Sequence, residues 1–262
     1  IWSQTPVRER CRILAKFGEL VLAEIDSIVD CLRLATGKVA CEALLGEIYP
    51  LLDLLAYYRK HAPDILADRR VATSPFAFPG ATAGIRYRPV GVAAIISPWN
   101  YPFQLSVAPL LTALFAGNAV ILKPSELSLP VGQLIVDLFQ RLELPPDLVQ
   151  WLAGDGSVGA QLIDADPDLV FFTGSLAGGR AVMRQAAQHP LPVLLELGGK
   201  DAMLVFADAD LDRAAAAAVY GAFSNSGQVC VSVERLYLQR QCHDEFLQRL
   251  LEATEQLRVG IG

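Results

Sequence analysis

The fold is decided by residues 89–122, PVGVAAIISPWNYPFQLSVAPLLTALFAGNAVIL, which carry no charged side chain over 122 − 89 + 1 = 34 positions. An apolar stretch of this length is long enough to consider a membrane-spanning helix. Two interruptions oppose that interpretation, because SPWNYP at 97–102 and Gly117-Asn118 are typical of turns. The stretch instead predicts a buried strand, a turn, a helix and a second buried strand, and we expect no membrane insertion.

The same alternation of strand and helix continues towards the C-terminus. We expect strands at residues 91–97, 119–122, 149–153, 169–173 and 193–197, with helices between them. Short apolar strands separated by helices predict an α/β fold with a Rossmann-like parallel sheet covered by helices on both faces. In such sheets ligands bind at the carboxyl edge, where polar and glycine residues gather in this sequence.

The segments on either side of this sheet have different patterns. Helical spacing of apolar residues begins near Thr5-Pro6, with Gly37 as a stop, and a second helical region covers 39–61, where Pro50 is expected to cause a kink. The proline- and glycine-rich residues that follow predict a protruding hairpin. We therefore divide the chain into a helical part at 1–70, a hairpin at 71–90, a Rossmann-like domain at 91–200 and the start of a second α/β domain at 201–262.

Composition excludes several classes of protein. Apolar residues make up 53% of the chain, which excludes a disordered protein, and the net charge of −6 without a cluster of Lys and Arg argues against a nucleic-acid partner. The five cysteines are scattered, odd in number and without a C-x-x-C pair, so we expect neither a disulfide framework nor a metal site. Together with the absence of a charged-then-apolar leader, this predicts a cytoplasmic protein.

Polar groups follow several of the expected strands. They are Asn100 in PWNYP, Lys123 and Glu126 in KPSE, Gly174, Ser175 and Gly179 in FTGSLAGG, and Glu196 in ELGGK. The glycines and hydroxyl of the third loop open a helix, an arrangement that suits a phosphate at a helix N-terminus.

Cys230 follows the polar run SNSGQ at 224–228 and precedes an apolar segment at 231–238 that we expect to be a strand. A free cysteine is more often an inert buried residue than a nucleophile. Taken alone, Cys230 is therefore open to both interpretations. The other four cysteines are expected to be packing or surface thiols.

Six segments together resemble the NAD(P)-dependent aldehyde dehydrogenase superfamily, in its order and spacing. They are PWNYP, KPSE, FTGS, ELGGK, GQxC and the Glu-Arg pair after the cysteine. The usual dinucleotide fingerprint G-x-G-x-x-G is absent. The resemblance implies that Cys230 attacks an aldehyde to form a thiohemiacetal and then a thioester. It implies that Asn100 and the backbone N–H of Cys230 bind the oxyanion, and that Glu196 activates the hydrolytic water.

The resemblance also implies a nicotinamide cofactor held by the first half of the chain. Lys123 and Glu126 would bind the adenosine ribose, and a carboxylate there repels a 2′-phosphate, which favours NAD over NADP. Ser175 would contact the pyrophosphate in the loop that contains Gly174 and Gly179, and Trp99 would line the cofactor cleft. In this reading, 91–200 is the NAD-binding domain and 201–262 the incomplete beginning of the catalytic domain.

Members of this superfamily are considerably longer, and their second half completes the aldehyde tunnel and joins subunits. We therefore expect an aldehyde dehydrogenase, or a fragment of one, acting on a small-molecule aldehyde and forming a homo-oligomer, a dimer or tetramer, in its full-length form. The alternative is a truncated, non-catalytic nucleotide-binding or interaction module. An acylating relative that uses coenzyme A is a third option, which Glu196 opposes because transfer to a thiol requires no base for water.

Overall fold

The computed structural model describes residues 1–260, and a five-stranded parallel sheet lies at its centre. The strand order is β5-β4-β3-β6-β7. The strands are β3 (Val92–Ile96), β4 (Ala119–Lys123), β5 (Val149–Trp151), β6 (Leu169–Gly174) and β7 (Val193–Leu197). All five were expected from their apolar runs, and the α/β fold class is confirmed.

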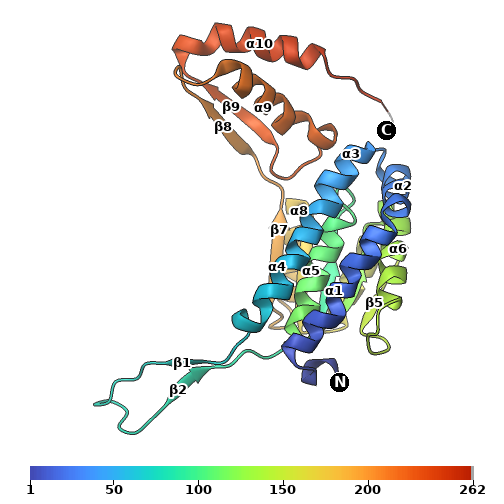
Figure 1. The fold of residues 1–262 in the computed structure, drawn as a ribbon, viewed down its shortest axis with the longest axis vertical. Coiled ribbons are helices and arrows are strands. Elements are labelled where there is room, and N and C mark those ends of the chain that lie inside the picture. Colours follow the sequence, from blue (N-terminus) through green and yellow to red (C-terminus); the bar gives the residue numbers. More distant parts are fainter. Residues whose placement is uncertain (261–262) are drawn as a thin grey trace.

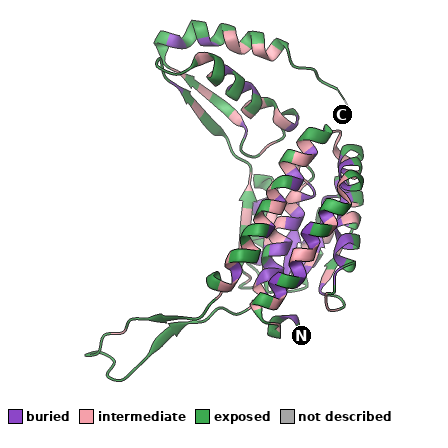
Figure 2. Cartoon of the chain, viewed as in Figure 1, coloured by how far each residue is buried: buried purple, intermediate pink, exposed green. Residues whose placement is uncertain are grey.

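The two faces of the sheet are covered by different helices, as the alternation of side chains along β3 requires. Ala93 and Ile95 belong to a large core beneath the N-terminal helices, whereas Ala94 and Ile96 pack in a second core with Val182. The first face carries α1 (Val7–Ala23), α2 (Ile25–Thr36), α4 (Tyr49–Ile65), α5 (Gln104–Ala116) and α6 (Leu129–Gln140), and the second carries α7 (Gly156–Asp164) and α8 (Leu176–Ala186). Figure 2 shows the buried residues concentrated beneath the N-terminal helices.

The second helical region differs from the sequence prediction near Pro50. It consists of α3 (Ala40–Ala43), a π-helical turn at Leu44–Ile48 and then α4. Pro50 lies in the first turn of α4, where its missing N–H costs little, so the irregularity lies in the π-helical turn before the proline. Gly37 ends α2 in the left-handed conformation, with φ 73°, as its position predicted.

A hairpin projects from the body of the molecule (Figure 1). It pairs β1 (Arg69–Val71) with β2 (Ala83–Ile85) in antiparallel register, and every residue of both strands is exposed. Pairing along β2 ends at Ile85, and the hairpin predicted for residues 71–90 therefore begins slightly earlier, at Arg69.

The C-terminal residues form a small unit beyond the end of β7 (Figure 1). Its parallel strands β8 (Asp201–Val205) and β9 (Val233–Leu238) pack with α9 (Leu211–Phe223) and α10 (His243–Glu255). The core of this unit is small and includes Val205, Ala218 and Phe246. The strand after Cys230 therefore begins at Val233, two residues later than expected. Among the described helices, none is both long and apolar enough to cross a membrane.

Candidate active site at the carboxyl edge of the sheet

The loops singled out in the sequence meet at one edge because the strands are parallel and in register. Ile96 lies opposite Lys123 on one side and Phe172 on the other, and Thr173 lies opposite Glu196. The segment that contains Asn100 leaves β3 at this edge. Within residues 1–260, no group of three or more His, Cys, Asp or Glu side chains is arranged to hold a metal ion.

Two loops are hydrogen-bonded to each other at this edge: the Asn100 loop, residues 100–104, and the cysteine loop, residues 225–230. The Asn100 side chain donates from Nδ2 to the carbonyl of Gln228 at 2.9 Å. In return, Asn225 donates from its own Nδ2 to the Asn100 carbonyl at 3.1 Å and to the Gln228 carbonyl at 3.3 Å. The structure therefore brings together the loops that contain Asn100 and Cys230, although these two residues are 230 − 100 = 130 positions apart in the sequence.

Left-handed backbone opens the cysteine loop. Asn225, Ser226 and Gly227 have φ values of 50°, 57° and 75°. Glycine adopts this conformation freely and asparagine tolerates it, but in serine it is sterically strained. The Asn225 N–H donates to the Glu42 carboxylate at 2.7 Å, which holds the turn in place. This turn leaves Cys230 exposed, whereas Cys11 and Cys242 are buried.

Glu196 is exposed on β7 and is linked to the cysteine loop through its neighbours. The Gly199 N–H donates to the Cys230 carbonyl at 3.1 Å. A Cβ at position 199 would lie 2.6 Å from that oxygen, so this approach requires glycine. The segment ELGGK is therefore in contact with the backbone of Cys230.

The KPSE loop gives Lys123 and Glu126 different environments. Lys123 is buried, and its Nζ lies 3.6 Å from the half-exposed carboxylate of Glu126. The Ser125 hydroxyl accepts a hydrogen bond from Leu127 N and fixes the turn. The carboxylate of Glu126 is thus partly exposed to solvent beside a buried ammonium group.

The FTGS loop begins α8 with a side-chain cap. Ser175 accepts a hydrogen bond from Gly178 N at 3.1 Å. A Cβ on Gly174 would lie 2.6 Å from the Phe172 ring, and one on Gly179 would lie 2.6 Å from Leu197. Close packing thus explains both glycines without a ligand. The backbone amides at the start of α8 still form a site where an anion is favoured, and the exposed side chain of Trp99 follows the neighbouring strand.

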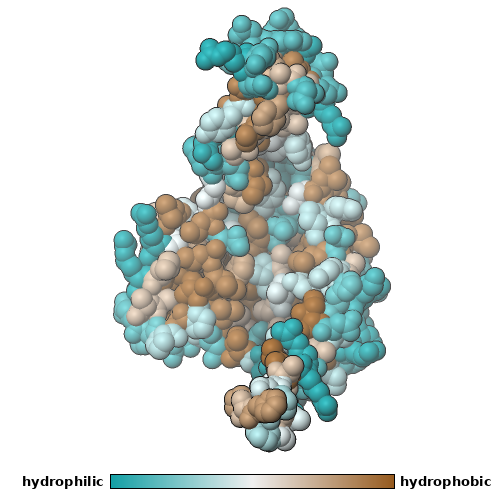
Figure 3. Space-filling model, turned by 90° about the vertical axis from the view of Figure 1, so that its left-hand side faces the viewer, coloured by the Kyte–Doolittle hydropathy of each residue, from teal (hydrophilic) through white to brown (hydrophobic). Residues whose placement is uncertain are grey.

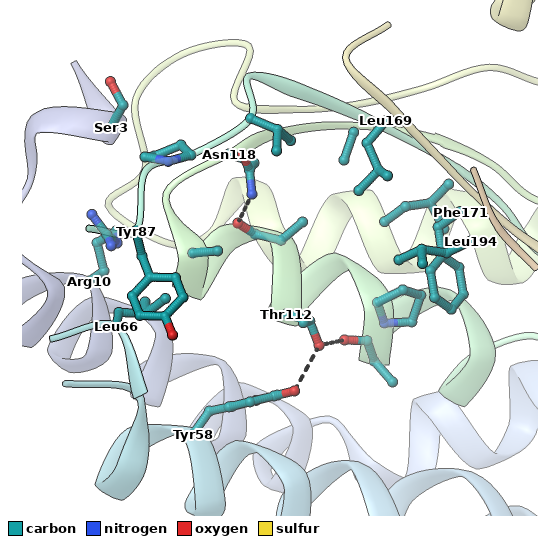
Figure 4. A pocket seen from close by; sticks show the side chains of 18 of the residues that line it. Ser3, Arg10, Tyr58, Leu66, Tyr87, Thr112, Asn118, Leu169, Phe171 and Leu194 are labelled. Atoms are coloured by element: carbon teal, nitrogen blue, oxygen red, sulfur yellow. Dashed lines mark hydrogen bonds between the residues drawn. The ribbon is translucent and has the colours of Figure 1, made fainter. Parts of the chain in front are cut away.

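An apolar hollow of about 970 Å³ lies between α5 and the sheet. Its wall includes Phe171 and Leu194 from the sheet and Thr112 from α5, which donates to the Tyr58 hydroxyl (Figure 4). Glu196 also lines this hollow. Figure 3 shows apolar side chains gathered on this side of the molecule, between the hairpin and the C-terminal unit.

Comparison with known proteins identifies the family that shares this arrangement. A model of the aldehyde dehydrogenase family matches residues 1–262. The chain belongs to the aldehyde dehydrogenase family.

Individual relatives match almost the whole chain. A 4,4'-diapolycopene aldehyde oxidase of Methylomonas sp is 68% identical over 260 residues, which are 99% of this chain and 49% of that protein. The NAD-dependent aldehyde dehydrogenase of Sinorhizobium meliloti is 33% identical, with a TM-score of 0.91, 98% of this chain covered and 50% of that one. An NADP-dependent enzyme of E. coli is 30% identical, with a TM-score of 0.93, and the match covers 99% of this chain and 53% of that one. The chain thus spans about half the length of the relatives it matches.

Three residues of this aldehyde dehydrogenase chain that contact the Asn100 loop were not expected from the sequence. Lys38 donates to the Asn100 carbonyl at 2.9 Å, Glu47 forms a buried ion pair with Lys38, and Asn225 joins the two loops. Their only sequence signal was weak: one charged side chain just after Gly37, another in a helical region, and one asparagine in the run before Cys230. None of these indicates a partner that is distant in the sequence.

Proposed function

We propose that this chain is the cofactor-binding half and the nucleophile-bearing start of an aldehyde dehydrogenase that oxidises an aldehyde to a carboxylic acid. The hydrogen bond from Asn100 Nδ2 to the Gln228 carbonyl carries the proposal. An amide nitrogen has two N–H groups, and this bond uses one of them. The other N–H is available to an oxyanion formed at the exposed thiol two residues further along.

The residues divide the chemistry among them. The Cys230 thiolate attacks the carbonyl carbon, and the negative charge that develops on the oxygen is stabilised by Asn100 and the Cys230 N–H. NAD, when bound, supplies the acceptor for the hydride that leaves the thiohemiacetal. Glu196 then removes a proton from the water that attacks the thioester, which releases the acid and the thiolate.

We assign the adenosine ribose of NAD to Lys123 and Glu126, the pyrophosphate to Ser175 and the amides near Gly174 and Gly179, and one side of the cleft to Trp99. The exposed carboxylate of Glu126 supports NAD over NADP, because it would repel a 2′-phosphate. Relatives named for either cofactor exist, so the preference is a property to measure. Glu126→Gln should raise kcat/KM with NADP relative to NAD, and an unchanged ratio would refute the assignment.

The relative that is 68% identical is named for an aldehyde of diapolycopene. We infer a large apolar aldehyde of that class as the substrate, acted on by a cytoplasmic homo-oligomer that the protruding hairpin helps to join. The exposed side chains of Phe76 and Val71 on the hairpin segment support a contact between subunits. Faster turnover of succinate semialdehyde than of the polyene aldehyde would contradict this substrate class.

The mechanism is tested by rapid mixing of aldehyde and NAD with the whole protein. Glu196→Gln should retain a burst of NADH and slow the subsequent turnover by about 10²-fold or more, because hydride transfer precedes hydrolysis. Loss of the burst with an unchanged later rate would reverse the assignment. No burst with the wild-type protein would favour the non-catalytic alternative.

A further inference from the structure

A buried ion pair lies against the Asn100 loop. Lys38 follows the C-terminus of α2 and Glu47 lies in the π-helical turn, and their side chains are 1% and 0% exposed. Lys38 Nζ and Glu47 Oε1 are 2.5 Å apart. Burying two charges carries a large desolvation penalty, so the pair needs further polar contacts to be retained.

The two charged groups bind different ends of the Asn100 loop. Lys38 donates to the Asn100 carbonyl at 2.9 Å, and its ammonium lies 4.2 Å from the centroid of the Tyr101 ring. The Glu47 carboxylate accepts from the N–H groups of Phe103 at 2.8 Å and Gln104 at 3.2 Å. Glu47 thereby satisfies two amides at the N-terminus of α5, where a negative charge is favoured. The pair thus holds residues 100–104 at both ends.

The Asn100 carbonyl accepts from Lys38 on one side and from Asn225 on the other. A carbonyl oxygen has two lone pairs, and this one uses both. The backbone of Asn100 is therefore fixed between the ion pair and the cysteine loop. The direction of its side-chain amide depends on that position, because the Cα–Cβ bond is set by the backbone.

We propose that Lys38 and Glu47 are positioning residues that set the Asn100 amide relative to the Cys230 thiol, and this inference rests on the proposed function. Neither residue needs to touch the aldehyde or the cofactor. A hydrophobic pair of similar volume often stabilises a fold as well as a buried ion pair does, so stability alone does not account for these charges. Of the four described hydrogen bonds that these two side chains form, one joins them to each other and the other three all go to backbone groups of the Asn100 loop.

The test is a double-mutant cycle in the whole protein with the NADH burst as readout. Lys38→Met/Glu47→Met replaces both charges at once and avoids the unpaired buried charge that a single change leaves. We expect this variant to fold, to keep its KM for NAD, and to lose about 10²-fold in the burst rate constant through misplacement of the amide. Arg141→Gln/Glu24→Gln, which removes a partly exposed pair on the helical side, is the matched control and should keep the burst.

The decisive comparison repeats the Lys38→Met/Glu47→Met change in an Asn100→Ala background. If the ion pair acts through Asn100, removing the pair from the Asn100→Ala variant should change the burst rate constant by less than about threefold, because the group that the pair positions is already gone. If Asn100→Ala is slow and removing the pair still lowers its burst rate constant as much as in the wild type, this inference is overturned and the proposed function stays intact. An Asn100→Ala variant with an undiminished burst would refute the role of Asn100 and this inference with it.

Discussion

The two loops that meet at the candidate site are held in opposite ways. The Asn100 loop is held by buried charges and continues into α5, whereas the cysteine loop is mostly exposed beyond the buried Asn225 and contains left-handed residues. The group proposed to stabilise charge is thus fixed by the core, and the proposed nucleophile lies on a strained and accessible turn. Strain of this kind persists only where the surroundings enforce it, here through Asn225 and Glu42.

The largest expected effect separates the chemical roles of the two loops. Cys230→Ala removes the nucleophile and should lower kcat by about 10⁴-fold or more with no NADH burst. Asn100→Ala removes one oxyanion donor and should cost about 10²–10³-fold while a slow burst remains. Stopped-flow fluorescence of NADH measures both. Equal losses in the two variants would mean that the loops do not divide the chemistry in this way.

The next effect concerns the buried charges beneath the Asn100 loop. Burial raises the pKa of Glu47, and the Lys38 ammonium and two backbone N–H groups oppose that rise. Lys38→Met leaves the carboxylate unpaired and should lower the free energy of unfolding by about 3–5 kcal/mol at neutral pH. Urea denaturation measures this loss.

The loss of unfolding free energy in Lys38→Met should depend on pH, with a sign that follows from the raised pKa of Glu47. Because of that raised pKa, the folded protein binds more protons than the unfolded chain. The contribution of Glu47 to stability is therefore fully present below the pKa of a glutamate in the unfolded chain, about 4.3, and is lost as pH rises through the pKa of Glu47 in the folded protein. The gap between variant and wild type should therefore widen from pH 5 to pH 8. A gap that narrows over this range would contradict the burial of an unpaired carboxylate.

A smaller effect is expected in the alkylation rates of the cysteines, which differ in their exposure to solvent. Cys230 and Cys41 are both exposed, whereas burial raises the pKa of the Cys11 and Cys31 thiols. We expect iodoacetamide at neutral pH to label Cys230 faster than Cys41, and both faster than Cys11 and Cys31, as read by peptide mass spectrometry. Because Cys41 matches Cys230 in exposure, equal rates at these two positions would show that exposure alone explains the reactivity of Cys230.

The smallest effect tests the strain in the cysteine loop. Ser226→Gly removes the backbone strain of a non-glycine residue at φ 57° and should therefore raise the free energy of unfolding by about 0.5–1 kcal/mol. Ser27→Gly, at an exposed position inside α2, is the matched control and should lower it by about 0.5 kcal/mol. Destabilisation by both substitutions would indicate that the left-handed turn is not strained.

The sequence by itself determined the strands and the loops at their ends. The strands were visible because each is a short apolar run between turn residues, and parallel pairing then required the loops that contain Asn100, Lys123, Ser175 and Glu196 to share one edge. The motif around Cys230 also marked its thiol as the candidate nucleophile, because the residues that form the motif are local in the sequence.

Only the tertiary structure decided what holds these groups in place. Lys38, Glu47 and Asn225 meet the Asn100 loop through contacts that span 56 to 125 residues of sequence. Local propensity carries no information about such contacts, because a buried ion pair and a solvated one look alike in a sequence. The order of the strands, the position of Lys38 after α2 and the packing of α5 against the π-helical turn bring these side chains together, and burial then makes each of their hydrogen bonds necessary.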